Sequence, residues 1–118
     1  MVGGNIDDHD KNISFLMGKN GQWALAPAYD VVYSIDPNTL YAQKGQFMSI
    51  NGKNQGITIK DLVTVARHYS INRPERIIEQ VMDIISRVSD YLLQDGVNES
   101  AINAILSELN EKHSELEA

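Results

Sequence analysis

The sequence contains no cysteine, which excludes disulfide bonds and zinc sites built from thiolates. It has no apolar run near the ~18 residues of a membrane-spanning helix, and no charged-then-apolar leader at its start. Basic residues are few, because 10 Lys and Arg stand against 16 Asp and Glu and give a net charge of −6. A general nucleic-acid binder or a protein of anionic membrane surfaces would show a basic face instead. These absences predict a soluble, cytoplasmic protein with no membrane partner.

The length of 118 residues suits one domain with a small core. A chain of this size buries roughly 65% of its unfolded surface, and 42% hydrophobic with 22% charged residues is not a disordered composition. The net charge lies in the second half, since residues 1–60 carry equal numbers of acidic and basic residues. We expect a single domain over residues 1–118, with a turn-rich part over 1–57 and a helical part over 58–118.

The turn-rich part predicts short strands. Residues 13–17 and 23–25 are apolar and flank the turn-forming run 18–22, a pattern typical of a β-hairpin with a loop of about five residues. Residues 46–50 are expected to form one more strand. Trp23, on the second hairpin strand, is expected to lie in the core.

The helical part predicts three helices. Thr58 and Asp61 have the spacing of a capping box, so a first helix should run from there to about Tyr69. Asn98 is placed to cap the last helix, whose residues from about Glu111 should fray.

The second of these helices should begin at Pro74, because proline is tolerated in a first turn, and end at Asp95-Gly96. Apolar residues recur along it at helical spacing and predict a core-facing stripe. The stripe consists of Ile77, Val81, Ile84, Val88 and Tyr91, widened by Ile78, Ile85 and Leu92. His68 and His113 are expected to face solvent on their helices.

The segment 5–12 carries three carboxylates, one imidazole and one ammonium in eight residues. A solvated polar loop is one interpretation of such a cluster. A calcium-binding EF-hand does not fit, because the acidic positions do not alternate and Gly18 stands where the bidentate glutamate would fall. A zinc site would need more than His9 and loop carboxylates.

Phosphoryl transfer fits this segment better. A kinase catalytic loop places an Asp five residues before an Asn, so that one orients the acceptor hydroxyl and the other holds magnesium. Asp7 and Asn12 have this spacing, and the hairpin should return the chain so that Asp30 lies near both. Carboxylate and amide oxygens are the ligands that Mg²⁺ prefers. Lys11 is placed to offset charge on the transferred phosphoryl group.

Two motifs carry a resemblance to a known family. Residues 5–12 read Asn-Ile-Asp-Asp-His-Asp-Lys-Asn, and residues 25–30 read Leu-Ala-Pro-Ala-Tyr-Asp. In this order they resemble the HipA-type serine/threonine kinases, the toxin half of bacterial toxin–antitoxin pairs, whose pattern is Asn-x-Asp-Asp/Gly-His-x-Lys-Asn followed by Leu-x-Pro-x-Tyr-Asp. The resemblance covers nearly the whole chain and is weak beyond about residue 95.

The resemblance implies a fold and a set of roles. The fold would be mainly α with a small β-hairpin, the C-terminal part of a protein-kinase-like large lobe. By position, Asp7 would be the catalytic Asp, and His9 and Lys11 would belong to the catalytic loop, with His9 supporting it. Asn12 and Asp30 would hold Mg²⁺ and, through it, the phosphates of ATP.

Members of this family are several times longer. This sequence has no counterpart of the Gly-rich loop that covers the phosphates of ATP, or of the strand Lys that pairs with them. We therefore expect a C-terminal fragment that is inactive alone. The implied partners are the missing N-terminal kinase lobe, a HipB-type antitoxin, a protein substrate such as an aminoacyl-tRNA synthetase, and DNA only through the antitoxin. The alternative is a non-enzymatic helical interaction module, or a degenerate kinase remnant that docks a partner protein.

Overall fold

The computed structural model describes residues 1–36, 38 and 45–118. Within them the chain forms a short 3₁₀ turn, η1 (Asp10–Asn12), a two-stranded antiparallel hairpin and four α-helices. The helices are α1 (Ile59–His68), α2 (Pro74–Ser86), α3 (Val88–Gln94) and α4 (Glu99–Glu117). A mainly helical structure with a small hairpin is thus confirmed.

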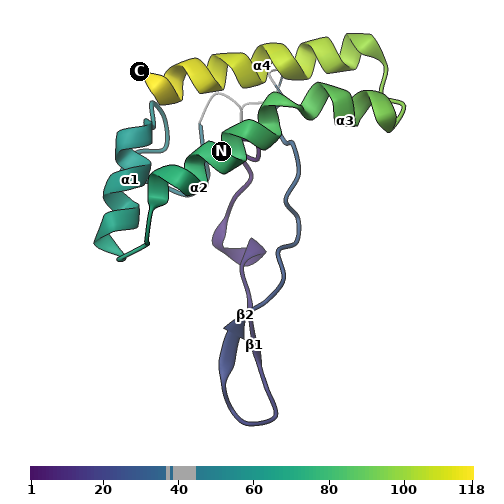
Figure 1. Ribbon diagram of the computed structural model, residues 1–118. Coiled ribbons are helices and arrows are strands. Elements are labelled where there is room, and N and C mark those ends of the chain that lie inside the picture. The colour runs from purple at the N-terminus through teal and green to yellow at the C-terminus, as the bar shows by residue number, and fades with distance from the viewer. Residues whose placement is uncertain (37, 39–44) are drawn as a thin grey trace.

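The hairpin consists of β1 (Phe15–Met17) and β2 (Trp23–Leu25), as the turn-forming run between them predicted. Phe15 pairs with Leu25 and Met17 with Trp23. The Gly18 N–H donates to the Gln22 carbonyl at 2.8 Å and closes the five-residue loop. Figure 1 shows the hairpin projecting away from the helices, with the loop at its far tip.

The expectation that Trp23 lies in the core is wrong. Its surface is 68% exposed, and every residue of both strands is exposed. The reason is the projection of the hairpin, because no other described element covers either of its faces (Figure 1). A large apolar side chain predicts burial only where a second layer exists.

Helix α1 begins and ends as its sequence dictates. The Thr58 hydroxyl accepts from the Asp61 N–H at 3.4 Å, and the Asp61 carboxylate accepts from the Thr58 N–H at 2.9 Å, which confirms the capping box. At the other end Ser70 has a φ of +56°, and the Ile71 N–H donates to the Ala66 carbonyl at 2.8 Å. This pattern is a Schellman-type ending with serine at the left-handed position.

The second predicted helix is in fact two. It is interrupted at Arg87, whose φ of −104° and ψ of 9° lie outside the helical range. The Ser86 hydroxyl donates to the Asp83 carbonyl at 2.7 Å, and the Arg87 Nε donates to the same carbonyl at 3.4 Å. Side chains that bond to the helix backbone in this way compete with its own ladder and bend it.

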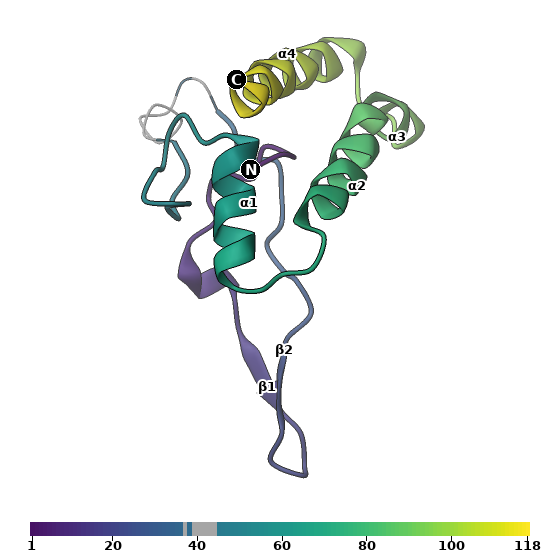
Figure 2. The ribbon, with the colours of Figure 1, turned by 60° about the vertical axis from the view of Figure 1, so that its left-hand side comes forward.

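The apolar stripe of α2 and α3 is exposed rather than buried, so this expectation is wrong for its leading residues. Ile84 is 52% exposed, and Ile77, Val81 and Tyr91 are exposed as well. The neighbouring row, which includes Ile85, is half-buried and faces the N-terminal turn, where a Cβ at Gly3 would lie 3.2 Å from Ile85 Cδ1. Figure 2 shows α2 and α1 on either side of the N-terminal segment.

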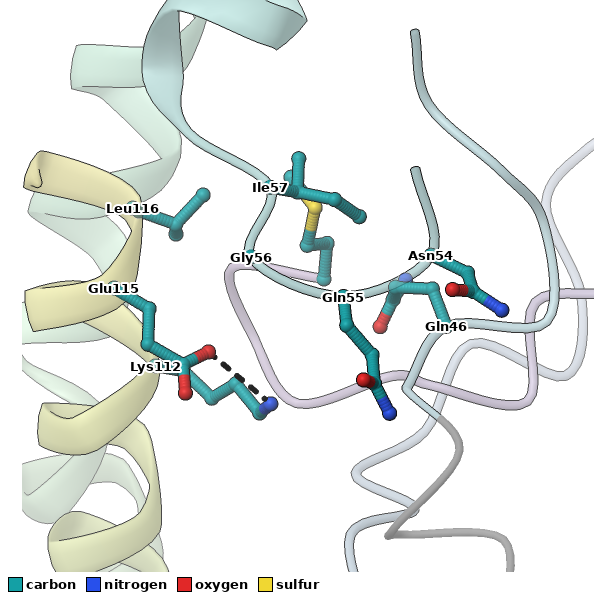
Figure 3. Close-up of a pocket in the computed structure, with 9 residues that line it drawn as sticks. Gln46, Asn54, Gln55, Gly56, Ile57, Lys112, Glu115 and Leu116 are labelled. Carbon is teal, nitrogen blue, oxygen red and sulfur yellow. Dashed lines mark hydrogen bonds and ion pairs between the residues drawn. The ribbon is translucent and has the colours of Figure 1, made fainter. Parts of the chain in front are cut away.

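Helix α4 supplies much of the core. Its buried residues are Ile102, Leu109 and Leu116, which recur every seventh position and form one stripe. The helix does not fray from Glu111 as expected, because Leu116 remains buried near the loop 54–57 (Figure 3).

His113, expected to face solvent, is half-buried instead, and its Nε2 lies 3.1 Å from the Val2 carbonyl. His68 is exposed as predicted. None of the described helices, α4 included, combines the length and the apolar character needed to cross a membrane.

The N-terminus of α4 offers a test of the predicted cap. The Asn98 Oδ1 accepts from the Ala101 N–H at 2.9 Å. We expect Asn98→Ala to lower the free energy of unfolding by about 1 kcal/mol, because a cap residue satisfies an otherwise unpaired helix N–H. Thermal unfolding followed by circular dichroism measures this. The control Asn103→Ala, at an exposed position inside the same helix, should be neutral or slightly stabilising.

Residues 46–50 do not form the predicted strand. Only Ile50 and Lys53 pair, across a turn in which Asn51 and Gly52 have φ values of +53° and +74°. Asn-Gly is the preferred sequence for such a turn. Gln46, the first residue of this segment, is buried, and its side chain is hydrogen-bonded to Asp8 in the polar segment near the N-terminus.

Candidate active site

The first residues of the polar segment 5–12 are hydrogen-bonded to the chain that follows β2. The Ser34 hydroxyl accepts from the N–H groups of Ile6 and Asp7 at 2.9 and 3.2 Å. The Ser34 N–H donates to the Gly4 carbonyl at 2.9 Å. Gly4 has a φ of +75°, and a Cβ there would lie 2.5 Å from the Tyr33 ring, so only glycine fits.

Asp7 and Asn12 meet across a single turn. The Asn12 Nδ2 donates to the Asp7 carbonyl at 3.1 Å, and the Asn12 N–H donates to the His9 carbonyl at 3.1 Å, which closes η1. The five-residue spacing therefore brings the two residues together locally. Because the carboxamide nitrogen is used in this bond, its oxygen Oδ1 is the atom left to bind a ligand.

Tyr29 joins the far end of the hairpin to this turn. Its hydroxyl donates to the Lys11 carbonyl at 2.8 Å. Asp30 follows directly with a φ of +53°, a conformation uncommon for a residue other than glycine. The hydrogen bond holds the segment that carries Asp30 against η1, as the hairpin argument predicted.

Asn12 and Asp30 line one cavity of about 150 Å³. The other residues of its wall are Asn5, Asp8, His9, Ile13, Tyr29, Val31 and Met48. Of the five predicted site residues, the structure thus brings His9, Asn12 and Asp30 to this cavity. Lys11 and Asp7 do not line it, but the Asp7 Oδ1 lies 3.8 Å from the His9 Nε2. The Asp7 side chain is 55% exposed and open to an incoming group.

The donor atoms around the cavity suit a hard cation. Asp30 offers a carboxylate and Asn12 a carboxamide oxygen, and the Asn5 Oδ1 is buried without a hydrogen-bond partner in the described chain. Among the described residues no three His, Asp or Glu side chains gather as a complete metal-binding group. A site with few protein oxygens fits Mg²⁺, which keeps water and phosphate oxygens in its shell.

His9 is packed rather than free. Its ring meets the Phe47 ring edge-on, with centroids 5.9 Å apart and an interplanar angle of 82°. Its Nδ1 is buried and has no hydrogen-bond partner among the described atoms. The buttressing role expected of His9 in the loop stays a prediction.

Sequence reasoning missed two residues of this site. Asp8 was counted only as one of three carboxylates, yet it accepts hydrogen bonds from Gln46, Phe47 and Met48. Asn5 opened the motif without a role, yet its orphaned oxygen belongs to a residue of the cavity wall. Both residues are part of the motif. Their contacts, however, are with residues about forty positions further along the chain, and such contacts leave no local pattern in the sequence.

A second, apolar cavity adjoins the first. Its volume is about 300 Å³, and it is lined by Asn12, Ile13, Ser14, Leu25, Ala26, Pro27, Ala28, Tyr29 and Val31. Four of these residues, Asn12, Ile13, Tyr29 and Val31, also line the first cavity. The two cavities therefore adjoin along one continuous surface at the base of the hairpin.

The structure defines a mainly helical unit in which a polar loop and a hairpin base flank a cavity that Asn12 and Asp30 both line. The family model of the HipA-like C-terminal domain matches residues 1–90, and the chain belongs to this family. The match includes the loop, the hairpin and α1 to the start of α3, whereas α4 lies beyond it. No curated protein and no solved structure matches the chain.

Proposed function

We propose that the chain is the catalytic-loop portion of an ATP- and Mg²⁺-dependent serine/threonine protein kinase. One observation carries the proposal: Asn12 and Asp30, far apart in sequence, line the same cavity beside Asp7. The Tyr29–Lys11 hydrogen bond supports this arrangement. Membership of the HipA-like C-terminal family is consistent with a kinase in the full-length protein.

The roles follow from chemistry and position. Asp7, exposed and next to the cavity, would accept the proton of the substrate hydroxyl and orient it for attack. Asn12 and Asp30 would hold Mg²⁺ through their side-chain oxygens. When bound, Mg²⁺ neutralises charge that develops on the phosphate oxygens. The exposed ammonium of Lys11 would offset further negative charge on the transferred group.

The adjoining apolar cavity supports a nucleotide as the second ligand. Apolar pockets with few polar groups are typical of sites for bases and other flat rings. Ile13, Leu25 and Val31 offer such a surface, and Asn12 lies where it meets the cavity that contains Asp30. ATP bound across both compartments would place its apolar part beside the hairpin and its phosphates beside Asp30.

The proposal includes partners. Elements that cover ATP would come from an N-terminal kinase lobe, without which the chain should be inactive. The exposed apolar side chains of the hairpin give that lobe a surface on which to pack. A HipB-type antitoxin would neutralise the kinase in the cytoplasm and provide its indirect contact with DNA. The substrate would be a protein hydroxyl, as in an aminoacyl-tRNA synthetase.

The exposed stripe of α2 favours the second candidate, a non-enzymatic interaction module. Ile77, Val81 and Ile84 form an apolar face that no described element covers. Such faces commonly mark protein–protein contacts. This function would need neither a cation nor ATP, so one titration separates the two candidates.

The test is a titration of the ¹⁵N-labelled chain with Mn²⁺, a paramagnetic substitute for Mg²⁺, with and without ATP. We expect line broadening confined to residues near Asn5, Asn12 and Asp30. Asp30→Asn should weaken Mn²⁺ binding at least about tenfold, since it removes the only carboxylate of the cavity that is not already hydrogen-bonded in the described chain. The dissociation constant from the broadening curves measures this.

Asp10→Asn is the matched control. It also removes one negative charge, from the adjoining segment 5–12, at an exposed position that does not line the cavity. We expect its affinity for Mn²⁺ to stay within about twofold of the parent chain, because exposed charges are screened by solvent and salt. Broadening that spreads over the acidic helices, or none at all with ATP present, would contradict the kinase proposal and favour the interaction module.

A further inference from the structure

We infer that Asp8 is a positioning residue: its carboxylate ties the candidate catalytic loop to the segment 46–48 and thereby fixes the cavity that Asn12 and Asp30 share. The inference rests on the proposed function, because it assigns to Asp8 the support of that site. The resemblance assigned Asp8 no role, and its position in the motif is occupied by either Asp or Gly.

Asp8 makes a dense set of hydrogen bonds for a loop carboxylate. Its Oδ1 accepts from the N–H groups of Phe47 and Met48 at 3.0 and 3.1 Å. Its Oδ2 accepts from the Gln46 Nε2 at 2.8 Å. Charge-assisted bonds of this kind are stronger than those between neutral groups. One side chain thus bonds to three consecutive residues that lie 38 to 40 positions further along the chain.

Gln46, one of the partners of Asp8, is itself held in place by further hydrogen bonds. Gln46 is only 7% exposed, and its Nε2 also donates to the Asn5 carbonyl at 3.3 Å. Its backbone N–H donates to the Asn54 carbonyl at 2.8 Å. Figure 3 shows Gln46 beside Asn54 and Gln55, opposite the C-terminal turns of α4. A buried amide cannot turn to water, so its bond to Asp8 has no ready substitute.

These bonds are the basis for assigning Asp8 to the anchor of the loop. Its Oδ1 accepts two hydrogen bonds and its Oδ2 accepts one, all from the segment 46–48, although the residue also lines the cavity. Its neighbour Asp7 makes no such bonds through its carboxylate and stays exposed. Of these two adjacent residues, Asp8 therefore anchors the loop, whereas the Asp7 carboxylate is exposed to solvent.

The anchor also fixes the wall of the cavity. Met48, held by Asp8 through its N–H, lines the cavity with Asn12 and Asp30. Phe47, whose N–H donates to both the Asp8 Oδ1 and the Ile6 carbonyl, provides the ring against which His9 packs. Release of Asp8 would therefore loosen the wall and the buttress together.

The experiment compares Asp8→Asn with Asp10→Asn in the full chain. Both changes remove one negative charge from the same loop, but only the first places an NH₂ group against the Gln46 amide. We expect Asp8→Asn to weaken Mn²⁺ binding about tenfold, as is typical when a group that supports metal ligands is lost. Asp10→Asn should change it by less than about twofold. A merely structural role would lower the Tm of Asp8→Asn and leave its Mn²⁺ affinity equal to that of the control.

Hydrogen exchange gives a readout that needs no cation. We expect the N–H groups of Asn12 and Met48 to exchange about tenfold faster in Asp8→Asn than in Asp10→Asn, while amides of α4 exchange equally in both. Equal exchange at these two positions would overturn the inference. If the parent chain fails to bind Mn²⁺, the proposed cation site is wrong, and exchange alone then decides whether Asp8 anchors the loop.

Discussion

Replacing Asp7 with asparagine in the full-length protein should reduce autophosphorylation by a factor of about 10² to 10⁴, the usual contribution of a positioned general base. The carboxamide keeps the size of the side chain but cannot accept the proton of the attacking hydroxyl. The hydrogen bonds that place the residue use its backbone, through Ser34 and Asn12, so the loop should keep its shape. Incorporation of labelled phosphate from ATP measures the effect.

The matched control for this result is again Asp10→Asn, since Asp10 lies three residues away, is exposed, and is assigned no role. Its activity should stay within about twofold of the parent, because the charge that is lost is exposed and screened by solvent and salt. Equal activity of Asp7→Asn and the parent protein would refute the role of Asp7. Similar losses in both variants would instead indicate that the charge of the loop as a whole matters.

Local signals in the sequence predicted the local parts of the fold. The capping box at Thr58, the cap at Asn98 and the five-residue hairpin loop each depend on neighbours within a few positions, and the structure contains all three. The interruption at Arg87 was missed because apolar periodicity continues through it, whereas its cause lies in bonds from two side chains to the Asp83 carbonyl.

Burial was harder to predict than secondary structure. Trp23 and Ile84 have the residue types and spacing of core positions, yet both are exposed, because no described element lies over them. Helix α4 shows the converse: its end was expected to fray, but Leu116 is buried near the loop that contains Ile57. Periodicity identifies which face of an element is apolar, but not whether another element covers it.

In the candidate site, too, some features could be predicted from local sequence and others could not. The spacing of Asp7 and Asn12 and the return of the chain to Asp30 were predictable from a motif and a hairpin. The structure places Asn12 and Asp30 at one cavity. The anchoring of Asp8 was not predictable, because residues 46–48 form no regular strand and because a side chain from a distant part of the sequence makes the contacts.

Replacing Asp61 with alanine should have the largest effect on stability. Its side chain is 7% exposed and accepts from the Asn51 Nδ2 at 2.8 Å, the Lys53 Nζ at 2.9 Å and the Thr58 N–H at 2.9 Å. One carboxylate thus joins the Asn-Gly turn to the first turn of α1. Its removal leaves several polar groups without partners, and we expect the Tm to fall by about 10 °C or more. Asp90→Ala, an exposed first-turn residue of α3, should change it little.

The same bonds make stability depend on acid. The hydrogen bonds from Asn51, Thr58 and Lys53 hold the pKa of Asp61 far below its usual range. A carboxyl whose pKa is lowered by folding stabilises the native state above its unfolded pKa of about 3.9, and that stability is lost as the pH falls toward the folded value. The Tm of the parent chain should therefore decline below about pH 4, and more steeply than that of Asp61→Asn. Parallel declines in the two chains, measured by calorimetry between about pH 5 and pH 2, would show that other carboxylates control acid unfolding.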